Sequence, residues 1–395
     1  LGFGYFQKQQ EKLRKRMKKN KKLLNRRTVV TSGLIVGGTS LLFSCKDKNE
    51  NLVSTEIKKN KNIFTLKMVT TWPKDFPGLG TSASRLASKI NKASQGRINI
   101  KVFGSGELVP AYESFDAVRN GVADMCHDSP YYWISKHPAT VFFSTLPSGL
   151  SSLEQTSWIL YGGGQKLWDD LYDRFNLVAF PSGNAGLQMF GWFKKEINSL
   201  QDLKGLKIRM SGMHAEVLSR IGAITVNIPG GEIMTSLQAG VVDGVEWGGP
   251  WMDLAFGFHK IVPYCYGPGL HEPGLNTSLT INKEVFNKMP EDLKNVIKLC
   301  CYSEITESLA EFNYRNTIIY KELSEKYKVK FRMLPEDIIK AWVENSELVI
   351  RDIASKDGIS KKIYESWNRY RENSMDISKY YELGFLKSRK SFSKS

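Results

Sequence analysis

Five residues of this chain place charge, hydrogen-bonding groups and an aromatic ring at the ends of expected strands or in the loops beyond them. They are Gln188, Arg209, Glu246, Trp247 and Glu272. In an open α/β sheet, ligands bind in the crevice beyond the strand ends. We therefore expect a ligand-binding crevice that one guanidinium, two carboxylates and an amide would line.

Signatures of catalysis are scarce in the sequence. It has no HExxH zinc pair, no GxSxG nucleophile elbow and no GxxxxGK[ST] phosphate loop. The glycines at 162–164 lie in an expected helix, without the strand-then-helix context that a phosphate site needs. The five histidines are scattered along the chain: His127, His137, His214, His259 and His271. The pattern favours binding over catalysis.

Strands that alternate with helices are expected to position the polar residues. Apolar alternation predicts strands at 64–72, 97–103, 122–125 and 241–247, with a further strand that ends at Arg209. Helices are expected at 81–93, 112–119, 290–323, 335–353 and 359–371. This order predicts an α/β fold with a largely parallel sheet and a helical C-terminal third.

One local pattern occurs twice, as FDAVRNGVAD at 115–124 and as SLQAGVVD at 236–243. In both copies an apolar helix face ends at a glycine, and Val-x-Asp then opens a strand. The repeat fits two lobes of similar construction around a shared cleft. The same pattern is also common in ordinary αβ loops, so both interpretations stay open.

The formal net charge is +16, but most of it lies at the two ends of the chain. Residues 1–27 carry +10 and the residues after Leu386 carry +4, which leaves +2 for everything between them. A nucleic-acid-binding face needs a dense basic patch on the folded domain. The charge distribution therefore excludes nucleic acid from the expected partners.

The segment 17–45, MKKNKKLLNRRTVVTSGLIVGGTSLLFSC, is typical of an export signal. Arg26–Arg27 resembles a twin-arginine signal, with a Sec signal as the alternative. The run 42–45 resembles a lipobox that would leave Cys45 acylated; an uncleaved anchor is the other possibility. We expect residues 1–45 to be the signal, with the true start at Met17, and the polar stretch 46–61 to be a disordered tether.

The five cysteines include no CxxC pair and no Cys/His spacing suited to zinc. Cys300 and Cys301 are adjacent in an expected helix, where successive side chains diverge by about 100°, which disfavours a bridge between them. Whether Cys126 and Cys265 form a disulfide is left open by the sequence.

Several long segments together resemble one family of exported binding proteins. They are TTWP at 70–73, FGSGELVPAYESFDAVRNGVADM at 103–125, GNAGLQMFGWF at 183–193, LKGLKIRMSG at 203–212 and SLQAGVVDGVEWGGP at 236–250. From about residue 63 to 380 the chain is similar to the periplasmic solute-binding component of TRAP (tripartite ATP-independent periplasmic) transporters, DctP type. The EW after VDG points to the branch for 2-oxo acids, lactate and related monocarboxylates, also called mannitol/chloroaromatic.

The resemblance implies a role for each polar residue. Arg209 matches the family's carboxylate clamp, since a guanidinium offers two parallel donors and stays charged; an arginine paired with a nearby aspartate at the strand end is the alternative. Glu246, the main-chain carbonyl of Trp247 and Gln188 match a cation site for Na+ or Ca2+, which take hard oxygen ligands. Glu272 matches a second acid near both ligand and metal.

Charge supports the implied cation. Glu246, Glu272 and a bound monocarboxylate carry three negative charges, and Arg209 supplies one positive charge. Burying the surplus would be costly, and a divalent cation would cancel it. A solvated or protonated Glu272 is the alternative.

Aromatic residues complete the implied pocket. Trp72, Tyr131 and Tyr132 match positions that line it in the branch, and apolar walls are normal for small-ligand sites. The run at 127–130, His-Asp-Ser-Pro, departs from the branch and puts a pyruvate-like substrate in doubt.

The resemblance also implies a two-lobed, type II-like periplasmic binding protein with mixed sheets flanked by helices and long elements that cross the hinge. We expect lobe one at 62–185 plus 275–315, lobe two at 186–274 plus 316–380, and a basic tail at 381–395. The protein would not be an enzyme. It would hand a small carboxylate to the small and large membrane subunits of the transporter, and C-terminal helices would support a homodimer. A ligand-sensing domain of the same fold, or a periplasmic enzyme acting on a chelated oxo acid, are the alternatives.

Overall fold

The computed structural model describes residues 62–391. The expected export signal and tether lie outside these residues, as does the end of the basic tail. Within the described part, no helix has both the length and the apolar character that a membrane span requires. Four cysteines fall in this part, Cys126, Cys265, Cys300 and Cys301; all four are buried free thiols.

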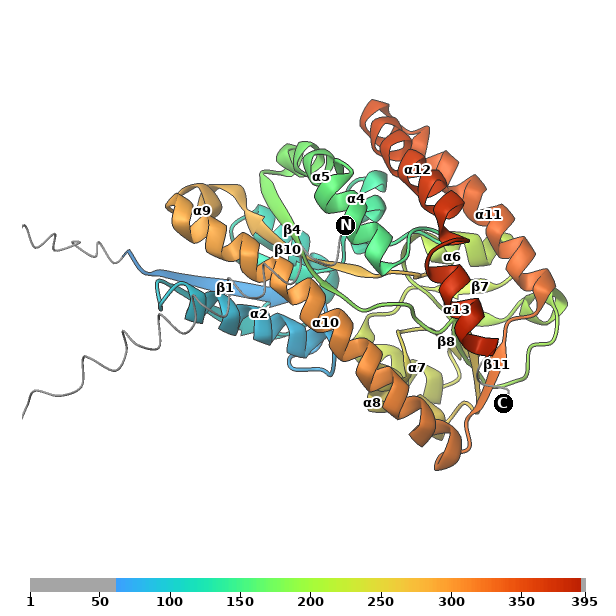
Figure 1. The fold of residues 1–395 in the computed structure, drawn as a ribbon. Helices are drawn as coiled ribbons and strands as arrows, with labels where there is room; N and C mark the ends of the chain where they lie inside the picture. Colours follow the sequence, from blue (N-terminus) through green and yellow to red (C-terminus); the bar gives the residue numbers. More distant parts are fainter. Residues whose placement is uncertain (1–61, 392–395) are drawn as a thin grey trace, which may run out of the picture. The chain divides into compact units, whose positions relative to one another are not determined.

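The first sheet has five strands (Figure 1). Their order is β2 (Ile98–Phe103), β1 (Phe64–Thr70), β3 (Met125–Asp128), β10 (Asn276–Asn282) and β4 (Leu177–Asn184). β1 runs parallel to β2 and β3, whereas β10 is antiparallel to β3 and β4. The late strand β10 is thus inserted between two early ones, and the sheet is mixed.

The second sheet has six strands. Their order is β11 (Lys330–Met333), β9 (Tyr264–Gly267), β5 (Gly191–Phe193), β8 (Gly244–Val245), β6 (Lys207–Arg209) and β7 (Ile224–Val226). β6 is parallel to β7 and β8, β9 is parallel to β11, and β5 is antiparallel to β8 and β9. Two mixed sheets flanked by helices agree with the predicted fold class.

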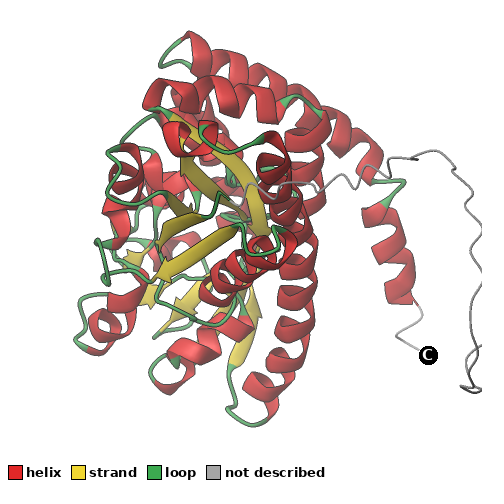
Figure 2. Ribbon diagram, turned by 90° about the vertical axis from the view of Figure 1, so that its left-hand side faces the viewer, coloured by secondary structure: helices red, strands yellow, loops and turns green. Residues whose placement is uncertain are grey.

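Eight shorter helices cover the sheets (Figures 1 and 2). They are α2 (Leu79–Ala93), α3 (Ser114–Arg119), α4 (Ser152–Tyr161), α5 (Gly164–Tyr172), α6 (Gly212–Arg220), α7 (Ile233–Gln238), α8 (Pro250–Phe256) and α9 (Lys283–Asn287). Short 3-10 turns join them, among them η2 (Pro130–Trp133), η3 (Pro138–Phe143) and η5 (Leu200–Leu203).

One long helix, α10 (Glu291–Glu325), contacts elements of both sheets. It packs on α2 and β4 of the first sheet and on α8 beside the second, as its course in Figure 1 shows. On the first side the buried Glu304 forms ion pairs with Arg85 at 2.6 Å and with Lys89 at 2.7 Å, both on α2. This charge cluster anchors the helix to the first sheet.

Three helices close the chain: α11 (Glu336–Ala354), α12 (Gly358–Ser378) and α13 (Glu382–Ser391). α11 packs mainly on α6, which follows β6 of the second sheet, whereas α12 packs on η3, α4 and α5, which lie between β3 and β4 of the first sheet along the chain. The expected assignment of 316–380 to lobe two stays a prediction. The expected basic tail is helical through Ser391, and Figure 2 shows α13 projecting from the rest of the described chain.

Three local predictions were wrong, each because a turn continues further than the pattern suggested. The strand expected at 122–125 begins only at Met125, since Val122 still donates its N–H to Ala117 of α3. The strand expected at 241–247 is reduced to β8, because Val241 bonds back to Ser236 of α7. At 162–164 the expected single helix is two, and Gly163 adopts a left-handed φ of 87° between them.

Candidate functional site

Parallel strands of the second sheet bring the predicted polar residues to one edge. β6 ends at Arg209, β8 is followed by Glu246 and Trp247, and β9 leads into the loop that carries Glu272. Because β5 is antiparallel to both β8 and β9, its start, just after Gln188, lies at the edge where those strands end. The sheet topology therefore explains why five residues far apart in the sequence converge.

Arg209 is fully buried, with 1% of its surface exposed. Its Nη1 donates to the main-chain carbonyl of Glu246 and, at 2.9 Å, to Oε2 of the same residue; its Nε donates to the carbonyl of Ile228 at 3.2 Å. Its Nη2 has no hydrogen-bond partner among the described residues. The arginine is thus paired with a glutamate and not with the aspartate of the alternative, yet it keeps one donor free.

Two buried glutamates lie beside this arginine. Oε1 of Glu246 lies 3.3 Å from Nε2 of His271, and Oε1 of Glu272 lies 3.6 Å from Nε2 of His214. Gln188 donates its side-chain amide to Oε2 of Glu272. Ligand atoms of Glu246, His271 and Glu272 all lie within 4.8 Å of one another.

Gln188 is held by close main-chain packing against the loop before Glu272. The N–H of Gly269 donates to the carbonyl of Gln188 at 2.9 Å. A Cβ at position 269 would lie 2.4 Å from that carbonyl oxygen, so the position requires glycine. With its amide nitrogen engaged, Gln188 leaves Oε1 buried and without a hydrogen-bond partner in the described chain.

The sequence analysis missed the two histidines of this centre, His214 and His271. Both are buried, with 1% and 0% exposed, and their rings meet edge to face at 5.7 Å between centroids. They are 57 positions apart, so no metal-like spacing marks them. The only sequence signal was position: His271 directly precedes Glu272, and His214 lies on α6, which begins three residues after Arg209.

The tyrosines of η2 reach the same centre from the first sheet. Tyr131 is buried and contacts the ring of His214 at 5.5 Å between centroids. Its side chain acts to lower the pKa of Glu272. Tyr132 packs on Tyr131 at 4.5 Å. The centre therefore contains side chains from segments that come directly after strands of both sheets.

The two tryptophans predicted for the pocket differ in position. Trp247 packs its ring against the guanidinium of Arg209, at 5.2 Å. Trp72 is also fully buried, but its ring neighbour is His127 of β3, at 5.1 Å between centroids. These contacts place Trp72 beside the first sheet, and its role in lining the pocket stays a prediction.

Burial and neighbouring charges shift the pKa values of Glu272 and Glu246 in opposite directions. Burial raises the pKa of Glu272 well above its ordinary value, and the nearby Glu246 raises it further. For Glu246 burial acts in the same direction, but His271 and Arg209 outweigh it and lower the pKa. Burial and the charge of Glu246 thus act toward the protonated form of Glu272, whereas His271 and Arg209 act toward the ionised form of Glu246. Of the alternatives considered for Glu272, burial excludes a solvated side chain.

The donor set fits a cation. Two carboxylates and the unpartnered Oε1 of Gln188 are hard oxygen ligands, and all three groups are buried within one centre. Among the described residues, Arg209 forms an ion pair with Glu246, and no arginine or lysine forms one with Glu272. Bound at this centre, a cation would bring positive charge to both glutamates.

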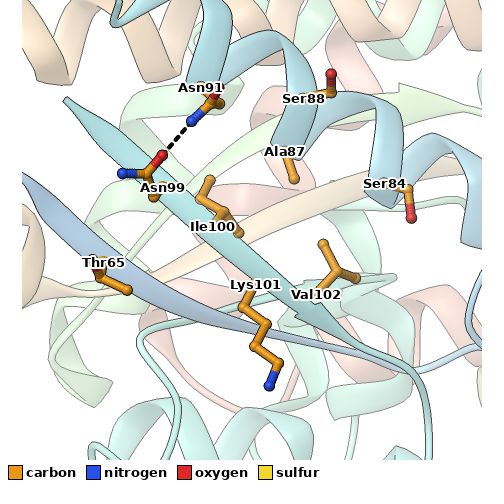
Figure 3. A pocket seen from close by; sticks show the side chains of 9 residues that line it. All are labelled: Thr65, Ser84, Ala87, Ser88, Asn91, Asn99, Ile100, Lys101 and Val102. Carbon is orange, nitrogen blue, oxygen red and sulfur yellow. Dashed lines mark hydrogen bonds between the residues drawn. The ribbon is translucent and has the colours of Figure 1, made fainter. Parts of the chain in front are cut away.

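A surface pocket away from this centre is lined by other kinds of residues (Figure 3). It lies between α2 and the edge strand β2, where Asn91 donates to Asn99. Its lining is mostly small or apolar, with Lys101 as the single charged residue. It includes none of the predicted site residues.

Comparison with known proteins agrees with this fold. Residues 68–357 match the DctP family, described as bacterial extracellular solute-binding protein, family 7. A monocarboxylate 2-oxoacid-binding periplasmic protein of Nostoc sp. is 33% identical over 364 residues, which cover 92% of this chain and 98% of the relative.

Two solved structures are similar along almost their whole length. A TRAP transporter solute-binding protein of Bordetella bronchiseptica, a dimer with calcium and picolinate bound, has a TM-score of 0.82 and 30% identity over 84% of this chain and 98% of its own. A TRAP periplasmic solute-binding protein of Pseudoalteromonas atlantica, with sodium and pyruvate bound, has a TM-score of 0.79 and 34% identity over 82% and 99%. Both support the predicted two-sheet fold.

Proposed function

The chain belongs to the DctP family of bacterial extracellular solute-binding proteins, and we propose that it binds a small monocarboxylate, such as a 2-oxo acid or lactate, at the centre around Arg209. The family consists of periplasmic solute-binding proteins of TRAP transporters and not of enzymes. This confirms the predicted family and the prediction that the protein is not an enzyme. We further propose that the loaded protein delivers its ligand to the small and large membrane subunits.

The observation that carries this proposal is the unpartnered Nη2 of the buried Arg209. A buried guanidinium donor without a partner is costly, and a ligand carboxylate would satisfy it with a charge-assisted hydrogen bond. Trp247 and Tyr131 supply the apolar walls beside it. The arginine clamp is therefore the role that we assign to this residue.

The second part of the proposed site is a cation, Na+ or Ca2+, held by Glu246, Glu272, Gln188 and the carbonyl of Trp247. It would neutralise the negative charge that the two acids and the ligand bring together. The related structures from Bordetella and Pseudoalteromonas have calcium and sodium bound together with a carboxylate. Gln188 supports the assignment, since its amide nitrogen orients toward Glu272 and leaves its oxygen available.

A thermal-unfolding screen of monocarboxylates tests the proposal. Pyruvate, 2-oxobutyrate and lactate are each added with and without Na+ or Ca2+. A true ligand at 100 times its Kd should stabilise the protein by about 2.7 kcal/mol, and the shift should be larger with the cation. Malonamide and glycerol, which lack a carboxylate, serve as controls. If no carboxylate raises the unfolding temperature with any cation, the proposed ligand class is wrong.

We also propose that α12 and α13 support a homodimer. α13 exposes three apolar side chains, with Leu383 at 44%, Phe385 at 62% and Leu386 at 42%. Replacing Leu383 and Phe385 by Asp should convert a dimer into a monomer in analytical ultracentrifugation and leave carboxylate binding intact. Replacement of Lys387 and Arg389 by Asp on the same helix is the control. A wild-type protein that sediments as a monomer at all concentrations contradicts the proposal.

A further inference from the structure

The buried imidazole of His214 has no part in the carboxylate clamp or in the proposed cation site. Its exposed fraction is 1%, and neither of its ring nitrogens has a hydrogen-bond partner among the described residues. Oε1 of Glu272 lies 3.6 Å from Nε2, which is too long for a hydrogen bond. Because buried polar groups are nearly always hydrogen-bonded, these nitrogens suit a ligand that brings a polar group to them.

The start of α6 holds His214 at the ligand centre. α6 begins three residues after Arg209, so its first turn lies at the edge of the sheet where β6 ends. Gly212, the first residue of α6, has a left-handed φ of 64°, and a Cβ there would lie 2.8 Å from the ring of Tyr131. Glycine thus permits the close approach of α6 to η2, and the ring of His214 contacts that of Tyr131 at 5.5 Å between centroids.

His214 lies next to the proposed cation site without belonging to it. The ligand atoms that lie within 4.8 Å of one another are those of Glu246, His271 and Glu272. The ring of His214 packs edge to face against that of His271, at 5.7 Å between centroids. A ligand whose carboxylate and 2-oxygen are held by Arg209 and the cation would therefore meet His214 with an atom further along its carbon chain.

We propose that His214 determines the specificity of the site by hydrogen-bonding a hydroxyl group on carbon 3 of the ligand. The preferred ligands are then 3-hydroxylated monocarboxylates, such as hydroxypyruvate and glycerate. This proposal rests on the proposed function, whose clamp and cation it keeps, and deepens it by naming the class of substrate.

A hydroxyl group suits this imidazole better than other substituents. A neutral imidazole has one N–H donor and one acceptor nitrogen, and a hydroxyl can accept from the first or donate to the second. A methyl group in its place would leave the buried nitrogen without a partner, which costs binding free energy. A second carboxylate would bring a further negative charge beside Glu246 and Glu272. The side chains of the centre therefore favour a ligand with one carboxylate and a hydroxyl.

Two pairs of ligands of matched shape test the proposal, because within each pair a hydroxyl takes the place of a methyl group. Hydroxypyruvate is compared with 2-oxobutyrate, and glycerate with 2-hydroxybutyrate, by calorimetric titration with Ca2+ present. In each pair the wild-type protein should bind the hydroxylated ligand at least about tenfold more tightly. His214→Phe keeps a ring without polar atoms and should bring the two Kd values to within about twofold of each other.

His259→Phe is the matched control, since His259 is a partly exposed histidine that packs on Tyr327 outside this centre. It should keep the wild-type ratio of Kd values. His214→Asn keeps a donor and an acceptor and should retain part of the preference.

Two results would overturn the proposal. One is equal affinity of the wild-type protein for the two ligands of each pair, which would show that water serves the imidazole equally well. The other is a wild-type ratio in folded His214→Phe protein. The wild-type titrations decide the first point even if the variants fold poorly.

Pyruvate, titrated on the same preparations, separates this proposal from the proposed function. If pyruvate binds with a cation but neither pair is discriminated, His214 does not set the specificity and the proposed function stands. If neither pyruvate nor any of the other four acids binds with Na+ or Ca2+, the proposed function itself fails.

Discussion

Arg209→Ala is expected to abolish carboxylate binding. The guanidinium is buried and offers the one unpartnered charged donor of the centre. Truncating one partner of a buried charged pair costs about 2–5 kcal/mol, which corresponds to a roughly 30-fold to several-thousand-fold rise in Kd. Calorimetric titration with the best carboxylate of the panel measures the loss.

Arg209→Lys distinguishes charge from geometry. An ammonium keeps the positive charge but presents a single point instead of two parallel donors, so weak binding should remain. Arg220→Ala is the control: Arg220 ends α6 and forms exposed ion pairs with Glu216 and Asp352, which contribute little. Wild-type affinity in Arg209→Ala protein that folds normally would remove the clamp from this residue.

Glu246→Gln is expected to uncouple the carboxylate from the cation. In the wild type, each ligand should strengthen the binding of the other, because together they neutralise the centre, and such coupling is reciprocal. The neutral amide keeps the shape of the side chain but removes the charge that attracts a cation. The ratio of carboxylate Kd without Ca2+ to that with Ca2+ should fall from at least about fivefold to less than about twofold.

The ratio of the carboxylate Kd without Ca2+ to that with Ca2+ tests the coupling, which the carboxylate affinity alone does not. Loss of Glu246 also releases Arg209 from its ion pair, so binding of the carboxylate without a cation can change in its own right. Glu216→Gln, an exposed acid on α6, should retain the wild-type ratio. A Glu246→Gln ratio equal to that of the wild type would show that another group holds the cation.

The sequence predicted the positions of residues correctly where those residues lie at the ends of strands. Arg209 and Glu246 are read directly from the ends of β6 and β8, because carboxyl ends of parallel strands meet at one edge. Gln188 and Glu272 follow from the same rule once β5 is known to lie between β8 and β9. The long helix α10 was equally accessible, since its predicted bounds, 290–323, nearly match Glu291–Glu325.

The sequence could not identify neighbouring residues that only tertiary packing brings together. His271 and His214 look scattered in the sequence, and only the meeting of the β9 loop with α6 joins them to the acids. Asp128, in the run 127–130 that departs from the branch, is buried and accepts hydrogen bonds from Trp133, at 2.9 Å, and from Ser278. The effect of this run on the substrate stays a prediction. Likewise, no helical period of α12 tells which sheet it will cover.

The continuity of α10 restricts how the halves of the described chain can move. With 35 residues at 1.5 Å each it is about 50 Å long, and it is fastened to α2 at one side and to α8 at the other. A continuous helix packed against both α2 and α8 prevents these elements from sliding apart along its length. A rotation of one relative to the other is the motion that the helix still allows.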